Sequence, residues 1–171
     1  MLAQQILPLG DSITDGYSVA GGYRTELYKR LTNSGSGFTY LGSQTDNASA
    51  VLTAGGQIHH EGHSGYRTDQ IYNNLLGSDG TSGNNSGFWL NGGNGTGRTA
   101  ITPGIILVHI GTNDKTQGEN TQTMTNKLWI LLNLLRTNQP QAKVFVASLI
   151  PRTDNASFES DQQASHGALL Q

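Results

Sequence analysis

The chain has 171 residues, a length that suits one domain with a hydrophobic core of its own. Charged residues make up 13% and the net charge is -2, so no broad basic surface would attract nucleic acid or an anionic membrane. The absence of cysteine excludes disulfides, thiol nucleophiles and thiolate metal sites. No apolar run has the length of a membrane span, so we expect neither nucleic acid nor membrane as a partner.

The first predicted element is a buried strand, Ile6 to Leu9, which ends at the turn Gly10-Asp11-Ser12. Ligands bind at the carboxyl ends of the strands in open α/β sheets. The hydroxyl of Ser12 is therefore a candidate nucleophile. The alternative interpretation is that Ser12 caps a helix, with Asp15 in its first turn.

A helix is predicted next, because Tyr23, Leu27 and Leu31 recur at helical spacing. A short strand, Phe38 to Leu41, follows after a Gly/Ser-rich break. Strand, helix and strand in this order favour a parallel sheet. The charged residues of the helix are expected mostly on its outer side: Arg24, Glu26, Lys29 and Arg30.

Residues 43–64 show little periodicity and end in the segment His59-His60-Glu61-Gly62-His63. The order of these residues does not match the zinc-protease pattern, so we expect a polar cleft loop and no metal site. Ser64-Gly65 follows, and Gly65 could present its backbone N–H ahead of a helix predicted over Thr68 to Leu76. Ser64 or Thr68 could cap that helix.

Residues 77–97 form a long Gly/Asn/Ser-rich loop, in which Phe88-Trp89-Leu90 is expected to pin the loop to the core rather than to stack on a sugar. Four N-glycosylation sequons favour a secreted, extracellular protein, although a chain rich in Asn, Ser and Thr produces several by chance. The sequons begin at Asn47, Asn84, Asn94 and Asn155.

A third strand is predicted at Ile105 to Ile110, with His109 as a hydrogen-bonded core residue. It ends at Gly111-Thr112-Asn113-Asp114, where Asn113 is either a turn former or an amide donor at a second strand end. The strongest helix is predicted over Thr121 to Asn138. A fourth strand follows at Lys143 to Ser148, and a weak helix at Ala164 to Leu170. No repeat or linker divides the chain, so residues 1–171 are expected to form one domain.

Three sequence blocks now stand at predicted strand or helix boundaries: residues 10–16, 62–68 and 111–114. Their order and spacing resemble the SGNH hydrolases, the GDSL-like esterase superfamily. Within this superfamily, residues 6–14 and 60–66 look most like the third carbohydrate esterase family, the acetyl xylan esterases. The resemblance implies a three-layer α/β/α, flavodoxin-like fold. It also implies that Ser12 is the nucleophile and that the oxyanion hole comprises the backbone N–H groups of Ser12 and Gly65 with the Asn113 side chain.

The sequence departs from this family at its C-terminal block, Asp-x-x-His, which supplies the general base. The nearest candidate is His166, five residues after Asp161 and too soon after the fourth strand. The resemblance implies further elements after that strand, so the sequence predicts a C-terminally incomplete domain. Such a sheet would have an open edge, and we expect self-association through it.

The resemblance implies a serine ester hydrolase without a cofactor, which removes acetyl groups from a polysaccharide such as xylan, or acts on a small ester, through an acyl-enzyme. The missing general base leaves open a catalytically impaired, carbohydrate-binding relative. A third alternative is a small-ligand or flavin-binding module that holds phosphate at the Ser12 turn.

Overall fold

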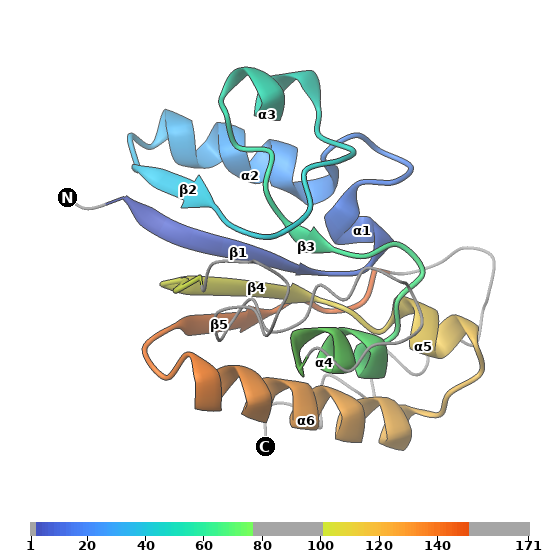
Figure 1. Cartoon of the computed structure of the whole chain (residues 1–171). Helices are drawn as coiled ribbons and strands as arrows, with labels where there is room; N and C mark the ends of the chain where they lie inside the picture. Colours follow the sequence, from blue (N-terminus) through green and yellow to red (C-terminus); the bar gives the residue numbers. More distant parts are fainter. Residues whose placement is uncertain (1–2, 77–100, 151–171) are drawn as a thin grey trace.

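The middle layer of the structure is a five-stranded sheet, which lies between two groups of helices in Figure 1. The structure is a computed structural model, and it describes residues 3–76 and 101–150. Strand β1 lies in the centre, with β4 and then β5 on one side, and β2 and β3 both pair with its other side. All of these pairings are parallel, as predicted. The strands are β1 (Gln4–Gly10), β2 (Phe38–Tyr40), β3 (Glu61–Gly62), β4 (Ile105–His109) and β5 (Lys143–Val146).

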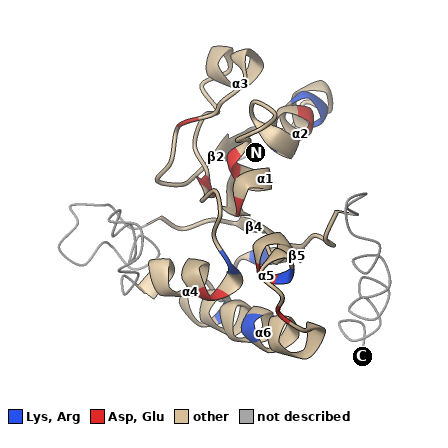
Figure 2. Ribbon diagram, turned by 90° about the vertical axis from the view of Figure 1, so that its right-hand side faces the viewer, with Lys and Arg blue, Asp and Glu red and all other residues tan. Residues whose placement is uncertain are grey.

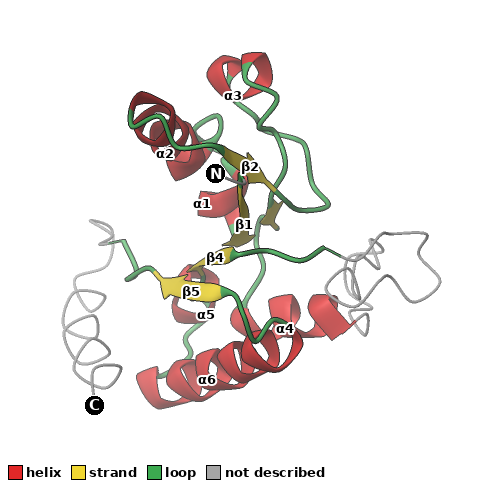
Figure 3. Cartoon of the chain, turned by 90° about the vertical axis from the view of Figure 1, so that its left-hand side faces the viewer, coloured by secondary structure: helices red, strands yellow, loops and turns green. Residues whose placement is uncertain are grey.

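Helices cover both faces of the sheet, which confirms the predicted three-layer α/β/α fold (Figures 1 and 3). Helices α2 (Gly22–Asn33) and α3 (Ala50–Ala54) lie on one face, and α4 (Thr68–Leu76) and α6 (Thr121–Asn138) lie on the other. Two short helices, α1 (Ser12–Asp15) and α5 (Thr112–Thr116), follow the carboxyl ends of β1 and β4.

Alternate residues of β1 serve two separate cores. Leu7 and Leu9 are buried in the larger core, which α4 and α6 close with Ile71, Leu131 and other apolar side chains. Ile6 points to the opposite face and packs with Tyr40 and Leu52. A strand with apolar residues on both faces is typical of a parallel sheet between two helical layers.

The periodic elements lie where the sequence predicts them. Helices α4 and α6 have the predicted bounds, Thr68–Leu76 and Thr121–Asn138. Strand β3 and helix α3 were not predicted, because they have only two and five residues in a segment without periodicity. The predicted fourth strand is therefore the fifth, β5. Within the described ranges, no helix combines the length and the apolar character that crossing a bilayer requires.

Arg24 corrects the prediction that the charged residues of α2 point outward. Its side chain is fully buried, whereas Glu26, Lys29 and Arg30 are mostly exposed. The guanidinium donates to the carbonyl oxygens of Thr14 (2.9 Å) and Asp15 (2.9 Å), at the end of α1. A third donor reaches the carbonyl of Ile58 at 3.1 Å. Arg24 therefore satisfies backbone acceptors that a short helix leaves without partners.

Strand β5 borders the sheet, and in the described part of the chain no strand pairs with its outer side. Phe145 is 55% exposed and Val146 is 39% exposed.

Several predictions concern residues outside the described ranges. These are the Phe88–Leu90 knot, the sequons at Asn84, Asn94 and Asn155, the helix at Ala164 to Leu170, and His166.

Candidate active site

Three neighbouring strands end side by side, and the three sequence blocks follow these ends. Gly10, the last residue of β1, pairs with Gly62 of β3 and with His109 of β4. The chain continues from these three residues to Ser12, Ser64-Gly65 and Asn113. The predicted site residues therefore come from one edge of the sheet.

Glycine is required at two of these strand ends because the chains lie very close together. A Cβ atom on Gly10 would lie 2.0 Å from the carbonyl oxygen of His109. A Cβ atom on Gly62 would lie 2.3 Å from the backbone nitrogen of Asp15. These contacts allow α1 to rest directly on the ends of β1 and β3.

Helix α1 is capped by Asp11 and not by Ser12. The Asp11 carboxylate accepts the backbone N–H of Ile13 at 3.0 Å. Ser12 is the first residue of the helix, so the alternative interpretation of Ser12 as the cap is wrong. Ser12 is half-buried, and no described group accepts a hydrogen bond from its hydroxyl. Ser12 therefore lies in the first turn of α1, just after the carboxyl end of β1.

The turn that carries Gly65 is attached to both neighbouring blocks. The N–H of His63 donates to the carbonyl of Gly10 at 2.9 Å, and the N–H of Tyr66 closes the turn on His63 at 3.1 Å. Gly65 is exposed and has a φ of +83°, a conformation that favours glycine. The Ser64 hydroxyl donates to the Asp15 carboxylate of α1. Neither of the two predicted caps of α4 is correct, because Ser64 bonds to Asp15 and Thr68 is the first residue of the helix, with its hydroxyl on Asp114.

Asn113 links the third block to the second. Its side-chain nitrogen donates to the carbonyl oxygen of Tyr66 at 2.8 Å, and Asn113 lies in the first turn of α5. Because an amide nitrogen carries two hydrogens, this bond fixes the amide plane and leaves a second donor. Asp114 accepts the backbone N–H (3.0 Å) and the hydroxyl (3.1 Å) of Thr68, so Asp114 satisfies the start of α4.

The His-rich segment is a buried structural network rather than the predicted cleft loop. His60, Glu61 and His63 are buried, and only His59 of this group is exposed. His63 Nε2 lies 2.6 Å from Glu61 Oε1, and the His63 ring stacks on Tyr66 with centroids 4.8 Å apart. No strand pattern reveals this pair, because β3 ends at Gly62 and His63 lies just beyond it.

His60 uses both ring nitrogens inside the protein. Nδ1 accepts the N–H of Gly62 at 3.1 Å, and Nε2 lies 3.1 Å from the carbonyl oxygen of Asp46, to which it can donate. Burial, followed by the charge of Arg24, lowers the pKa of His60 to about 4. His60 is therefore neutral at pH 7.

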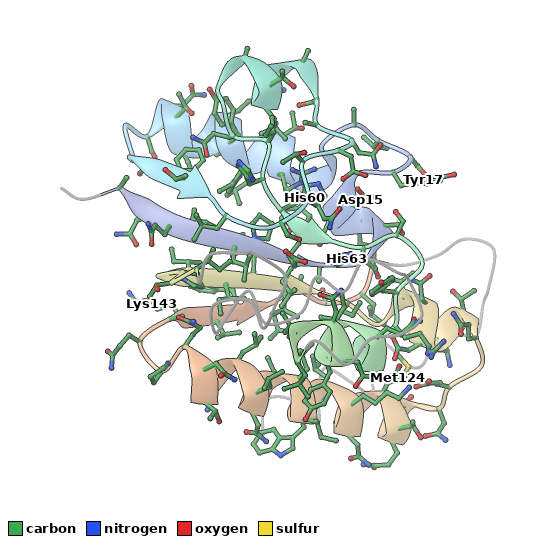
Figure 4. The ribbon with its side chains drawn as sticks, in the orientation of Figure 1. Asp15, Tyr17, His60, His63, Met124 and Lys143 are labelled. Carbon is green, nitrogen blue, oxygen red and sulfur yellow. The ribbon has the colours of Figure 1, made fainter. Side chains whose placement is uncertain are left out.

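Two acidic clusters have the spacing of metal ligands, but protein groups already occupy them. In the first, Asp15, Asp46 and His60 bring ligand atoms within 4.8 Å of one another (Figure 4). The Asp15 oxygens accept from Ser64 and, at 2.9 Å, from Asn47, while His60 is bonded as described above. This cluster joins α1 to the segments before and after β3.

The second cluster contains Asp69, Asp114 and Glu119, where α4, α5 and α6 meet (Figure 2). The ammonium group of Lys127 lies 3.0 Å from Asp69 and 3.8 Å from Asp114, and it also contacts Glu119. Lys127 therefore supplies the cation of this cluster.

Two buried groups at the strand ends lack a full set of partners. Asp11 is fully buried, and its second carboxylate oxygen has no hydrogen-bond partner among the described residues. Burial raises the pKa of Asp11 to about 6, although the N–H of Ile13 opposes the rise. His109 was predicted to be hydrogen-bonded, but neither ring nitrogen has a partner in the described ranges, so that prediction is wrong. Burial lowers the pKa of His109.

The sequon at Asn47 is built into the structure. The Asn47 side-chain nitrogen, where a glycan would attach, donates to Asp15 at 2.9 Å. The Ser49 hydroxyl accepts the N–H of Leu52 at 3.3 Å and caps α3. Both sequon side chains therefore have structural roles.

No protein-family model matches the chain. A multidomain esterase from Ruminococcus flavefaciens is 35% identical over 160 residues, which are 90% of this chain and 20% of that protein. The solved family 3 carbohydrate esterase from Clostridium thermocellum has a TM-score of 0.74 and 29% identity, over 97% of this chain and 70% of that chain. A family 3 carbohydrate esterase from Talaromyces cellulolyticus has a TM-score of 0.67 and 25% identity, over 96% and 71%.

The fold is that of solved proteins of the SGNH, or GDSL-like, superfamily, such as a family 3 carbohydrate esterase. Within this superfamily the chain resembles the family 3 carbohydrate esterases, which confirms the resemblance predicted from the sequence. The chain spans about a fifth of the length of the multidomain esterase that it matches.

Proposed function

We propose that the protein is a serine carboxylic ester hydrolase, with Ser12 as its nucleophile. The observation that supports the proposal is that β1, β3 and β4 end side by side, and that Ser12, Gly65 and Asn113 follow these three ends. The esterases among the similar proteins support the same activity.

In the proposed reaction, Ser12 Oγ attacks the ester carbonyl carbon and loses its proton to a base. The negative oxygen of the tetrahedral intermediate accepts hydrogen bonds from the N–H groups of Ser12 and Gly65 and from the Asn113 amide. The intermediate collapses, the alcohol leaves with a proton, and water then cleaves the acyl-enzyme to release the acid. Each fixed donor is worth about 3–4 kcal/mol of the barrier.

The Asn113 amide suits this role because its orientation is already fixed. One hydrogen is committed to the Tyr66 carbonyl at 2.8 Å, so the other has a defined direction. The Gly65 N–H belongs to a turn that Ser64 and His63 anchor to Asp15 and Gly10. Donors that need no reorganisation during the reaction stabilise charge more effectively than mobile donors.

The proton acceptor for Ser12 is not assigned: His166 is only a weak candidate by its spacing in the sequence, and it lies outside the described residues. Ser12 needs such a base because a serine hydroxyl is a weak nucleophile at neutral pH. An oxyanion hole alone still gives about 10³–10⁴-fold catalysis over water. A slow esterase is therefore expected even if the base is lacking.

The substrate is proposed to be an acetylated polysaccharide such as xylan, and the location extracellular. The support is the similarity to family 3 carbohydrate esterases and the number of sequons. The acyl group transferred to Ser12 would be acetyl, and water would release acetate.

Replacing Ser12 with alanine tests the proposal. Ser12→Ala should abolish release of acetate from acetylated xylan and from a chromogenic acetate ester. Ser36→Ala is the matched control, because Ser36 is exposed on the turn before β2, at the amino ends of the parallel strands and away from the carboxyl end that Ser12 follows. Turnover that survives Ser12→Ala would refute the mechanism. Calorimetric binding of acetylated oligosaccharide with no turnover by the unchanged chain would favour the carbohydrate-binding alternative.

A further inference from the structure

The loop between α1 and α2, residues 17–20, presents two apolar side chains to solvent. Tyr17 is 71% exposed and Val19 is 70% exposed, more than any other large apolar side chain in the described ranges. Tyr17 follows α1 directly and points away from the body of the protein, near the carboxyl ends of the strands (Figure 4). The loop contains no charged residue.

The backbone of this loop is firmly held, so the exposure does not reflect a loose segment. The N–H of Tyr17 donates to the carbonyl of Ser12 at 3.3 Å, and the N–H of Gly22 donates to Val19 at 2.7 Å. Gly16 has a φ of +85°, and a Cβ atom there would lie 2.7 Å from the nitrogen of Gly21. The two ends of the loop are therefore in contact, and its side chains are displayed on a fixed frame.

Arg24 and Asn47 hold the backbone on either side of the loop. Its guanidinium binds the carbonyl oxygens of Thr14 and Asp15, just before the loop begins. The N–H of Gly21 donates to the carbonyl of Asn47 at 2.6 Å, just after the loop ends. A surface ordered in advance loses little conformational entropy when it binds a ligand.

We propose that Tyr17 and Val19 form a sugar-binding platform that holds the backbone of a neutral acetylated polysaccharide next to Ser12. This inference rests on the proposed function. The flat, apolar face of a sugar ring packs on an aromatic ring, and the tyrosine hydroxyl can bond to a sugar hydroxyl. An uncharged platform suits an uncharged chain. The N–H of Tyr17 donates to the carbonyl of Ser12, so the backbone of the platform is joined directly to the residue proposed as nucleophile.

The platform predicts a dependence on substrate size. We expect Tyr17→Ala, in the full chain, to lower the ratio of kcat/KM for acetylated xylo-oligosaccharides to kcat/KM for a chromogenic acetate ester about tenfold, roughly the effect of one aromatic contact. The loss should appear mainly in KM for the oligosaccharide. Tyr17→Phe should retain most of the ratio. Trp129→Ala is the control, because Trp129 is an aromatic residue of α6 that is 62% exposed.

An unchanged ratio in Tyr17→Ala, or an equal fall in Trp129→Ala, would overturn the platform while leaving the esterase proposal intact. A binding measurement separates the two proposals further. Calorimetry with acetylated xylo-oligosaccharide in the Ser12→Ala background needs no turnover, and it should show affinity about tenfold weaker when Tyr17→Ala is added. Equal affinity with and without Tyr17 would refute the platform, whereas failure of the esterase proposal would appear as no hydrolysis of either substrate.

Discussion

At the scale of single residues, the two N–H bonds of the Asn113 side-chain nitrogen have different roles. One N–H bonds to the Tyr66 carbonyl at 2.8 Å, and the other is proposed to stabilise the oxyanion. A side chain that only formed the turn would not affect the reaction rate.

Asn113→Ala should therefore lower kcat about 10²–10³-fold, with little change in KM, because the lost bond is stronger in the transition state than in the bound substrate. Steady-state kinetics on a chromogenic acetate ester measures both constants. Asn33→Ala, at the exposed end of α2, is the control. A wild-type kcat in Asn113→Ala would assign Asn113 to the turn alone.

Asp11 gives a pH-dependent contribution to stability. Its pKa rises from 3.8 to about 6 in the folded state, so between these values the unfolded chain ionises first and gains stability relative to the folded one. The stabilising contribution of protonated Asp11 is thus lost as the pH rises from about 4 to about 6.

Asp11→Asn should remove this loss while preserving the cap, because asparagine caps helices about as well. At 1.4 kcal/mol for each pKa unit, the variant should exceed the wild type in free energy of unfolding by roughly 2–3 kcal/mol at pH 7 and by about nothing near pH 4. Urea unfolding at the two pH values measures the difference. The lowered pKa of His60 makes stability rise with pH over this range, but it does so equally in the wild type and in Asp11→Asn. A difference that does not depend on pH would contradict the assignment.

At the scale of secondary-structure elements, Arg24 joins α2 to α1 by donating to the last carbonyl groups of the shorter helix. Lysine has one compact ammonium group and cannot reproduce the planar, forked set of donors. The three carbonyl acceptors would then compete for a single group.

Arg24→Lys should therefore lower the free energy of unfolding by about 2–4 kcal/mol, since it leaves buried acceptors without donors. Thermal or urea unfolding measures the loss. Arg30→Lys, on the exposed side of α2, should change stability by less than about 0.5 kcal/mol. Equal stability of the two variants would show that the Arg24 bonds contribute little.

The periodic elements could be predicted from the sequence, because packing follows the apolar pattern. Helix α6 has one long apolar stripe, and its predicted bounds match the structure. Strand β3 could not be predicted, since its two residues gain their structure only by pairing with Leu9 and Gly10 of β1. The burial of Arg24 was missed for a similar reason: its partners lie in α1 and before β3, and no local pattern reveals them.

At the scale of the whole molecule, the parallel pairing of β1 with β3 and β4 explains why the three short blocks lie at adjacent strand ends. The carboxyl ends of neighbouring parallel strands lie at the same side of the sheet, independently of the loops that connect the strands. The pairing of His63 with Glu61 and the bond from Ser64 to Asp15 could not be predicted, because they depend on side-chain directions at the strand ends.

The edge strand β5 predicts self-association. Phe145 is 55% exposed, and no described strand pairs with the outer side of β5. Open edges with apolar side chains pair with other chains. Sedimentation velocity should show a dimer or larger species that becomes monomeric in Phe145→Lys. A wild-type chain that stays strictly monomeric at high concentration would contradict this expectation.

The central claim, that Ser12 is a nucleophile, can be tested by covalent labelling. A phosphonate ester that reacts with activated serine should add one group to the wild-type chain, and peptide mass spectrometry should locate it on Ser12. The Ser12→Ala variant should remain unlabelled. Hydrolysis of an acetate ester by a chain whose Ser12 stays unmodified, with the label on another residue, would contradict the account.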